Sequence, residues 1–135
     1  MKKFGIILSA TALIAALTSC NKMQKQQKLN SPNNQIETVF SLTKTGEPAY
    51  SVVFNGQPII KPSLMGFSFE NQPPLSQGLE LIKVERTWIN QKWELPWGET
   101  REVIDKHNSM TLYLKETGGQ KRLLNIVFKA FDNGI

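Results

Sequence analysis

The sequence predicts an all-β fold, a partial β-sandwich preceded by a signal-peptide helix. Three observations lead to this prediction. Apolar and polar residues alternate with a period of two in several segments, which is typical of strands with one buried face. The dipeptide Asn55-Gly56 lies between two such segments and is the strongest short-range signal for a β-hairpin. Outside the signal, no stretch keeps the 3.6-residue apolar repeat of a helix.

The first 19 residues have the pattern of a secretory signal peptide. Lys2 and Lys3 form a basic start, and residues 4–17 are free of charge and largely apolar. This run is shorter than the roughly 20 residues that a helix needs to cross a bilayer. A short apolar segment with a basic start and small residues at its end indicates a cleavable signal.

The signal ends in Leu-Thr-Ser-Cys, which resembles the bacterial lipobox and implies that Cys20 is acylated. Two or more acyl chains anchor a protein stably to the lipid bilayer. A plain signal peptide with an incidental cysteine is the alternative. Because Cys20 is the only cysteine, the chain has no disulfide to form, and acylation accounts for the odd thiol. We expect an exported lipoprotein. Asn21, rather than an aspartate, follows Cys20, and this pattern is associated with sorting to the outer membrane. We expect the protein to face the periplasm.

Residues 20–30 are expected to be the lipidated cysteine and a polar tether. Lys22, Lys25 and Lys28 lie in this segment, and the signal holds two more lysines. Residues 31–135 therefore keep 11 basic and 11 acidic residues, so the net charge of +5 comes from the leader and the tether. A neutral folded part with no basic-aromatic stripe argues against nucleic-acid binding.

Residues 31–135 are enough for one small domain. The period-2 pattern and the turn signals predict its strands at residues 36–42, 50–54, 57–60, 66–70, 79–88, 109–116 and 122–131. Pro58 restricts its strand to an edge or to the strand's beginning. Gly118-Gly119 and residues 132–134 are predicted turns.

The last predicted strand, residues 122–131, has apolar residues on both faces. We expect it to be covered on both sides, as a central strand would be. Ile135 then looks like the first residue of a further strand. An uncompleted strand would leave an unpaired edge, so we expect a truncated chain or a fragment.

The sequence offers no obvious catalytic constellation. His107 is the only histidine, and we interpret it as a solvated turn residue rather than a metal ligand or a base. The Gly118-Gly119 pair lacks the Lys-Ser/Thr of a phosphate loop. A glycosidase needs two carboxylates across a sugar, and the sequence alone cannot pair them.

The most unusual local composition is residues 87–105, where three tryptophans lie among carboxylates. Tryptophan faces and carboxylates together can contact carbohydrate. Trp88, at the end of a strand, is expected to be core, whereas Trp97 is as easily functional as structural. Glu99 is either a ligand-facing carboxylate or an ion-pair partner of Arg101, with the ion pair slightly favoured.

Four segments in order carry a family resemblance: SPNNQIETVFSL, GEPAYSVVFNGQPIIKPSLMGFSF, PWGE and RLLNIVFKAFDNGI. Residues 31–135 resemble the amino-terminal domain of glycoside hydrolase family 97. The resemblance implies a β-supersandwich of the galactose-mutarotase-like kind. The family's larger members add a catalytic (β/α)₈ barrel and act as calcium-dependent α-glucosidases or α-galactosidases.

The resemblance transfers no catalytic residue, because the barrel that holds the family's catalytic carboxylates is missing here. It implies no cofactor in this segment and calcium only for the full-length family. It also implies that Trp97 and Glu99 contact the barrel or carbohydrate near the active-site mouth. We favour an accessory domain of an exported glycan-degrading α-glycosidase. The alternative is a stand-alone lipoprotein module that binds carbohydrate or protein.

Overall fold

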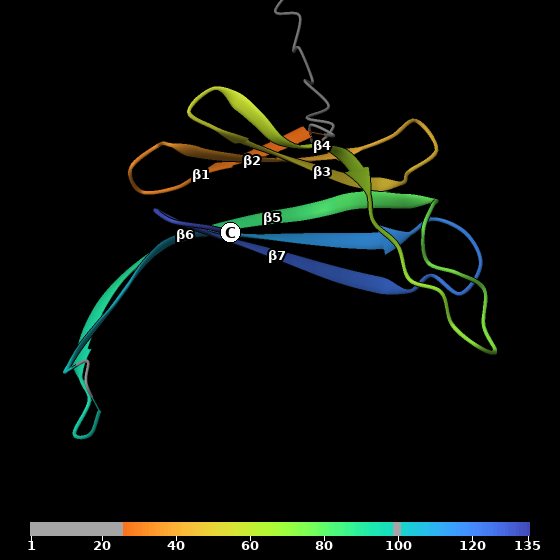
Figure 1. Ribbon diagram of the computed structural model, residues 1–135. Coiled ribbons are helices and arrows are strands. Elements are labelled where there is room, and N and C mark those ends of the chain that lie inside the picture. The colour runs from red at the N-terminus through yellow and green to blue at the C-terminus, as the bar shows by residue number, and fades with distance from the viewer. Residues whose placement is uncertain (1–25, 99–100) are drawn as a thin grey trace, which may run out of the picture.

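The chain forms two antiparallel sheets that stack face to face, with no helix in residues 26–98 and 101–135, which are the residues that this computed structural model describes (Figure 1). One sheet has the order β1-β2-β3-β4 and the other the order β5-β6-β7. The all-β sandwich prediction is confirmed. The expected signal helix and Cys20 lie outside the described residues. The strands are β1 (Gln26–Asn30), β2 (Ile36–Leu42), β3 (Pro48–Phe54), β4 (Gln57–Leu64), β5 (Leu79–Glu94), β6 (Glu102–Glu116) and β7 (Leu123–Phe131).

The core lies between the two sheets. Phe40 of β2 and Met110, Leu112 and Leu114 of β6 are completely buried. The ring centroid of Phe128 on β7 lies 6.5 Å from that of Phe40 across the sheet interface. Burying such side chains stabilises the folded state by about 25 cal/mol for each Å² of apolar surface removed from water. This burial holds the two layers together.

The first strand corrects the predicted tether. Residues 26–30 form β1, which pairs with β2 along its whole length, from Gln26 opposite Ser41 to Asn30 opposite Glu37. Leu29 is only 6% exposed and belongs to the core cluster. The segment is polar because β1 lies at a sheet edge, so a single apolar residue suffices to anchor it. The part of the tether before residue 26 lies outside the described residues.

The predicted Asn55-Gly56 hairpin is confirmed. Asn55 has φ 47° and Gly56 has φ 78°, as a two-residue type I′ turn requires. The turn joins β3 to β4, and Pro58 lies in β4 at the edge of its sheet. An edge position lets the proline lack an N–H without removing a bond from the middle of the sheet.

The strand predicted at residues 66–70 is wrong. In place of a strand, residues 65–78 form a loop that carries one isolated bridge, between Phe67 and Leu75. Leu75 is 4% exposed and closes one end of the core, while Phe67 stays half exposed. The alternation in this segment therefore serves an irregular loop that inserts one leucine.

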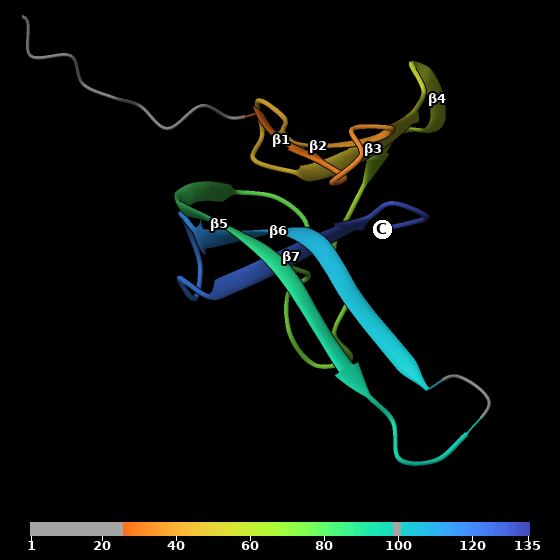
Figure 2. The ribbon, with the colours of Figure 1, turned by 90° about the vertical axis from the view of Figure 1, so that its left-hand side faces the viewer.

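Strands β5 and β6 are much longer than predicted. β5 continues to Glu94 and β6 begins at Glu102, whereas the sequence predicts strands at 79–88 and 109–116. The extension projects beyond the sandwich as a long two-stranded ribbon (Figures 1 and 2). Because the ribbon buries neither face in a core, its residues need no alternation, and the sequence pattern missed them.

Strand β7 has the predicted extent but not the predicted cover. Within the described residues it is the edge strand of its sheet, beside β6 alone. Leu123 is 70% and Val127 is 53% exposed, so the outward face is not covered. The turn at residues 132–134 is confirmed, because the amide of Phe131 donates to the carbonyl of Gly134 at 2.8 Å.

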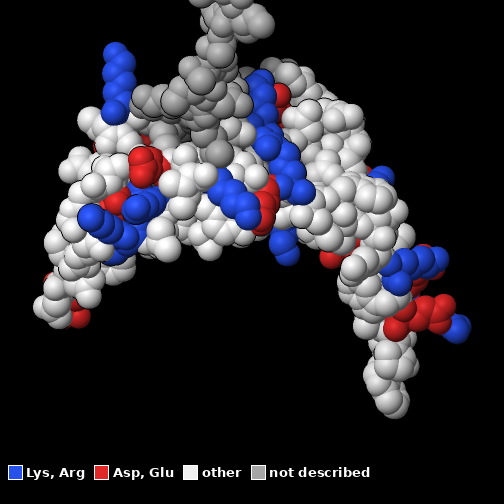
Figure 3. All heavy atoms as spheres, turned by 180° about the vertical axis from the view of Figure 1, so that it is seen from behind, with Lys and Arg blue, Asp and Glu red and all other residues white. Residues whose placement is uncertain are grey.

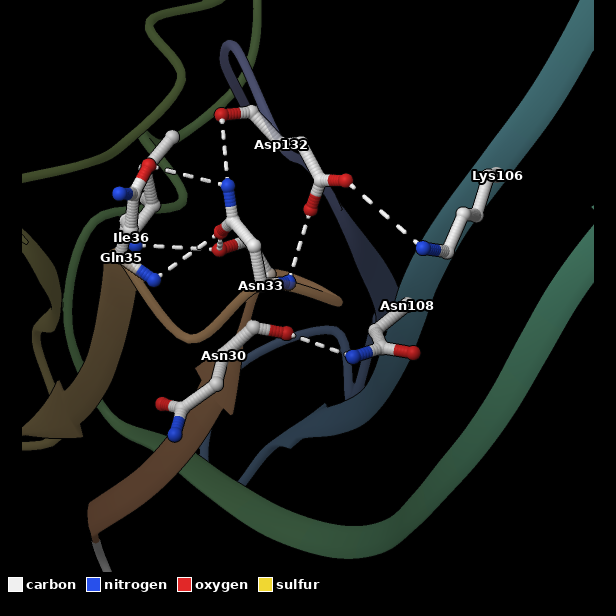
Figure 4. A network of polar contacts seen from close by, with 8 residues as sticks. Asn30, Asn33, Gln35, Ile36, Lys106, Asn108 and Asp132 are labelled. Atoms are coloured by element: carbon white, nitrogen blue, oxygen red, sulfur yellow. Dashed lines mark hydrogen bonds and ion pairs between the residues drawn. The ribbon is translucent and has the colours of Figure 1, made fainter.

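A polar network joins the two sheets at the end of β7 (Figure 4). The amide of Asn33 donates to the carboxylate of Asp132 at 2.8 Å, and Nζ of Lys106 lies 3.9 Å from the same carboxylate. Nδ2 of Asn108 donates to the carbonyl of Asn30 at 2.8 Å. These contacts fix β1 relative to β6, which positions the surface described below.

Candidate functional site

The feature that departs most from a plain sandwich is the far part of the β5–β6 hairpin. The last residue of β6 that pairs with β7 is His107, opposite Phe131. From there to the turn, β5 pairs only with β6, ending with Glu94 opposite Glu102. We call residues 90–98 and 101–106 the hairpin arm. It forms one limb of an arch whose other limb is the loop 65–78 (Figure 3).

The arm exposes apolar side chains. Trp97, predicted as a contact residue, lies at the tip and is 84% exposed. Trp93 and Ile104 lie on the two strands of the arm and are 44% and 62% exposed. A concentration of exposed apolar side chains on a projecting element is typical of an interaction surface.

Trp88 corrects the prediction that it belongs to the core. It lies on β5 at the base of the arm and is 61% exposed. Its register partner on β6 is Asn108, which points toward β1 (Figure 4). The opposite sheet ends at β1, so no apolar layer covers Trp88. Its place in the alternating pattern is that of a buried residue, but its side chain is exposed.

Charged groups on the arm pair with one another. Lys92 and Glu102 lie 2.6 Å apart, and Nε of Arg101 lies 3.4 Å from Oε2 of Glu94. These exposed pairs stabilise little on their own, and Figure 3 shows both charge signs gathered toward the end of the arm. Glu99 lies outside the described residues, so its predicted pairing with Arg101 stays a prediction.

His107 corrects another prediction. It lies inside β6 rather than in a turn, is 3% exposed, and packs its ring 4.7 Å from that of Phe131. Its Nδ1 lies 2.5 Å from Oδ1 of Asp105. The imidazole is therefore enclosed at the root of the arm, where it orders the junction between the arm and β7.

The carboxyl groups with displaced pKa values are unsuited to general-acid catalysis. Hydrogen bonding to Lys83 lowers the pKa of Glu85, and the hydrogen bond from the Tyr113 hydroxyl lowers it further. Hydrogen bonding to Arg122 lowers the pKa of Glu116. A glycosidase acid needs its pKa raised instead, so neither carboxyl has the required environment.

In residues 26–98 and 101–135, no three His, Cys, Asp or Glu side chains gather in a way that could hold a metal ion. Calcium therefore stays an expectation for the full-length family. The described residues also include no helix that is both long enough and apolar enough to cross a membrane.

A hollow at the base of the arm was missed by sequence reasoning. It has a volume of about 530 Å³ and lies between β1, β2 and the two strands of the arm's base. Trp88 lines it together with Lys28, Glu37, Arg86 and Asn108. The sequence predicts a tether at residues 26–30, so no sequence signal places Lys28 beside Trp88.

The fold defines an antiparallel β-sandwich domain, and the site defines it as one that presents tryptophans on and beside a projecting hairpin. A family model described as "Glycosyl-hydrolase 97 N-terminal" matches residues 29–135. The chain belongs to this family, and residues 29–135 match its amino-terminal domain. The match begins within β1, in agreement with the structure, which places β1 in the domain.

Relatives agree with this assignment. The chain is 25% identical over 135 residues to a retaining alpha-galactosidase of Bacteroides thetaiotaomicron, and it spans 19% of the length of that protein. A Glycoside Hydrolase Family 97 enzyme from Pseudoalteromonas sp. strain K8, solved in complex with panose, superposes with a TM-score of 0.73. The identity is 32%, over 78% of this chain and 16% of that one. The structure with acarbose gives the same values.

A crystal structure of a beta-arabinopyranosidase superposes with a TM-score of 0.68 at 20% identity, over 79% of this chain and 17% of that chain. This likeness shows the shared fold alone. The same sandwich therefore occurs at 20% identity, so the packing of the two sheets tolerates extensive sequence change.

Proposed function

We propose that the domain is the accessory domain of an exported glycan-degrading α-glycosidase and that it docks a catalytic (β/α)₈ barrel through the hairpin arm. Family membership and the named relatives support this role. The observation that carries it is the arm itself. A two-stranded ribbon has no core of its own, and isolated hairpins are marginally stable in water.

The arm suits docking because its apolar side chains lie on both of its faces and at its tip. Trp93 is paired with Val103, and Ile104 is paired with Lys92. Paired residues lie on the same face, and adjacent residues of a strand lie on opposite faces. Trp93 and Ile104 therefore lie on opposite faces of the arm. Trp97 extends past the last pair. Large aromatic side chains near the centre of an interface contribute most of the binding energy.

The outer face of the β5-β6-β7 sheet extends the docking surface. Leu123 and Val127 project from β7 on the same face as Thr111 and Tyr113 of β6. This face forms the roof of the arch between the hairpin arm and the loop 65–78 (Figure 3). A convex barrel rim placed in the arch would cover Leu123 and Val127, together with one side of the arm.

Catalysis is assigned to the barrel. The arm carboxylates Glu94 and Glu102 each face a cation, and the pKa values of Glu85 and Glu116 are lowered. Neither condition supplies the protonated carboxyl that must donate to a leaving sugar. The domain's contribution is to position the barrel and to bring Trp97 and Glu99 near the mouth of its active site.

The test is association with a catalytic (β/α)₈ barrel of family 97, produced as a separate polypeptide and measured by calorimetry. We expect a one-to-one complex, and we expect Trp97→Ala to weaken it about tenfold, as loss of a central aromatic residue does. Lys61→Ala, exposed on β4 in the opposite sheet, is the matched control and should leave affinity unchanged. Equal affinity for wild type and Trp97→Ala contradicts docking through the tip.

A stand-alone lipoprotein module that binds carbohydrate or protein is the second candidate. The exposure of Trp88 beside polar groups favours it. In this case the purified domain is monomeric, folds cooperatively and binds maltooligosaccharide, with loss on Trp97→Ala. Aggregation of the isolated domain supports the barrel-docking role instead, because it reveals surfaces that need a partner.

The leader supports export. We propose that residues 1–19 are a signal peptide and that Cys20 is acylated and anchors the protein in the outer membrane, facing the periplasm. The basic residues between Cys20 and β1 then lie close to an anionic surface, where each contributes roughly 1 kcal/mol of attraction. The localisation rests on the lipobox-like sequence and the residue that follows it.

A further inference from the structure

The hollow at the base of the hairpin arm combines an aromatic face with fixed polar groups. Trp88 is 61% exposed, and its strand neighbours on the same face are Arg86 and Asn90. Trp93 lies five positions beyond Trp88 along β5, or about 16 Å at 3.3 Å per residue, and Trp97 lies past the end of that strand. The hollow is therefore a different place from the tip of the arm, where Trp97 lies.

The polar groups of the hollow are held in place by the fold. Nδ2 of Asn108 donates to the carbonyl of Asn30 at 2.8 Å, and its side-chain oxygen points away from that bond (Figure 4). The amide is thereby oriented to accept a hydrogen bond from a ligand. An acceptor fixed beforehand costs little conformational entropy when a ligand binds.

Arg86 adds oriented donors. Its Nη2 donates to Oε1 of Gln27 at 2.8 Å and to the carbonyl of Lys28 at 3.4 Å. A guanidinium carries five N–H donors, and both of these contacts use Nη2. In the described part of the chain its two recorded partners are neutral oxygens, so the cation is placed without a paired carboxylate.

Glu37 completes the set. Its two carboxylate oxygens accept from Nζ of Lys28 at 3.1 and 3.2 Å. Each oxygen keeps a lone pair for a further donor, because a carboxylate offers about four acceptor sites. Arg86 with its donors, Glu37 and Asn108 with their acceptors, and Trp88 therefore all line one hollow of about 530 Å³.

We propose that this hollow is a binding site for a neutral oligosaccharide, separate from the tip of the arm, with one pyranose ring stacked on Trp88. The C–H groups of a pyranose match the indole face, while its hydroxyls both donate and accept, as the polar groups here require. A purely apolar ligand would cover the remaining donors and acceptors of Glu37, Arg86 and Asn108 without pairing them, which is unfavourable. The hollow is open to solvent, so it admits a chain of sugars rather than a single enclosed one.

This inference goes beyond the docking role. A site on the flank of the arm would hold a glycan near the accessory domain while the barrel acts on another part of it. The effect is a raised local concentration of glycan ends, as in other multivalent systems. The proposed glycan site rests on the proposed function for its class of ligand. The experiment must therefore separate failure of the glycan site from failure of the docking role.

The test is a glycan array of α- and β-linked glucosides, galactosides, mannosides and uronates, probed with the mature chain from residue 20 carrying Cys20→Ser to prevent acylation. The best neutral glycan is then titrated by calorimetry. We expect Trp88→Ala to weaken binding about tenfold, from loss of the stacking platform. We expect Glu37→Gln to weaken it several-fold while preserving the shape of the side chain.

Ile59→Ala is the matched control, because it removes an exposed apolar side chain from β4 in the other sheet and should leave glycan affinity unchanged. Thermal melting of each variant confirms folding, and the exposure of Trp88 means that its loss removes little core packing. Retention of no neutral glycan overturns the proposal, as does retention of uronates alone. Loss of binding on Trp97→Ala but not on Trp88→Ala also overturns it and leaves the role of the tip intact.

Discussion

Gly46 has no space for a side chain. It has φ +79°, and a Cβ there would lie 2.6 Å from the backbone nitrogen of Leu79 and 2.7 Å from its oxygen. Both atoms are backbone, so neither can move aside cheaply. We expect Gly46→Ala to lower the free energy of unfolding by about 1–3 kcal/mol in a urea titration.

Gly118→Ala is the control for this prediction. A Cβ at Gly118 meets no atom within 4 Å, and its φ is not positive. We expect its effect to stay within about 0.5 kcal/mol. Equal effects of the two substitutions would contradict the contact between Gly46 and the start of β5.

The pair Glu116–Arg122 makes stability depend on pH. Nη2 of Arg122 lies 2.8 Å from Oε1 of Glu116, and hydrogen bonding to Arg122 lowers the pKa of Glu116 below its ordinary value of 4.5. The unfolded chain therefore takes up this proton at a higher pH than the folded one. The contribution is present above about pH 4.5 and is lost as the pH falls through the lower pKa of the folded state.

The measurement is the midpoint of thermal unfolding from pH 7 to pH 3 for wild type and Glu116→Gln. We expect wild type to be the more stable at neutral pH and the difference between the two to shrink below pH 4.5. Glu70→Gln, an exposed residue of the loop, is the control and should follow wild type. A difference that stays constant down to pH 3 rules out this ion pair as its source.

At the residue scale, the sequence predicted turns better than environments. Asn55-Gly56 was predictable because its positive φ values are a property of the dipeptide itself. The burial of His107 was not, since it depends on Phe131, which is distant in sequence and meets it only through the pairing of β6 with β7. The exposure of Trp88 likewise depends on where the opposite sheet ends.

At the element scale, the hairpin arm is separable from the sandwich. The sandwich core of Phe40, Leu112 and Phe128 contains no residue of the arm. We expect replacement of residues 92–104 by Asn-Gly, which joins the opposed residues Gln91 and Asp105 and keeps the contact of Asp105 with His107, to change the free energy of unfolding by less than about 1 kcal/mol. The same replacement should abolish association with the barrel in the calorimetric assay.

The matched control for the arm is a change in the sandwich. Leu112 is completely buried, and Leu112→Ala should cost about 2–5 kcal/mol in the same urea titration. If shortening the arm were as costly as this cavity, the arm would be part of the folding unit. It would then be a structural element and a weaker candidate for docking.

Elements with a buried face were predictable, and elements without one were not. β2 shows strict alternation because its odd and even residues face different environments, and its predicted bounds are those observed. The outer halves of β5 and β6 carry no such constraint. The sequence predicts a tether in place of β1 because one buried residue, Leu29, is too little to form a pattern.

At the scale of the whole molecule, the order of short sequence segments predicted the family, and the two-sheet fold follows from it. Periodicity could not specify which sheet each strand joins, because antiparallel neighbours depend on long-range pairing. The structure places Trp97 exposed at the tip of the arm, and its contact role stays a prediction. The hollow beside Trp88 was not predictable from the sequence, because it needed the placement of β1.

The leader makes a prediction for the complete protein in its membrane. We expect the wild-type chain expressed in a bacterium that processes lipoproteins to sediment with outer membranes, because two or more acyl chains anchor stably. Cys20→Ser should move it to the soluble periplasmic fraction, as judged by fractionation and immunoblotting. An unchanged membrane fraction for Cys20→Ser would refute anchoring through this cysteine.

The central claim is that the domain serves a family 97 catalytic barrel, and the most direct measurement is to sequence the gene beyond the codon for Ile135. The account predicts a sequence encoding a (β/α)₈ barrel of this family, either in frame or displaced by a frameshift. A stop codon followed by an unrelated gene with its own start signals would contradict it and favour the stand-alone binding module.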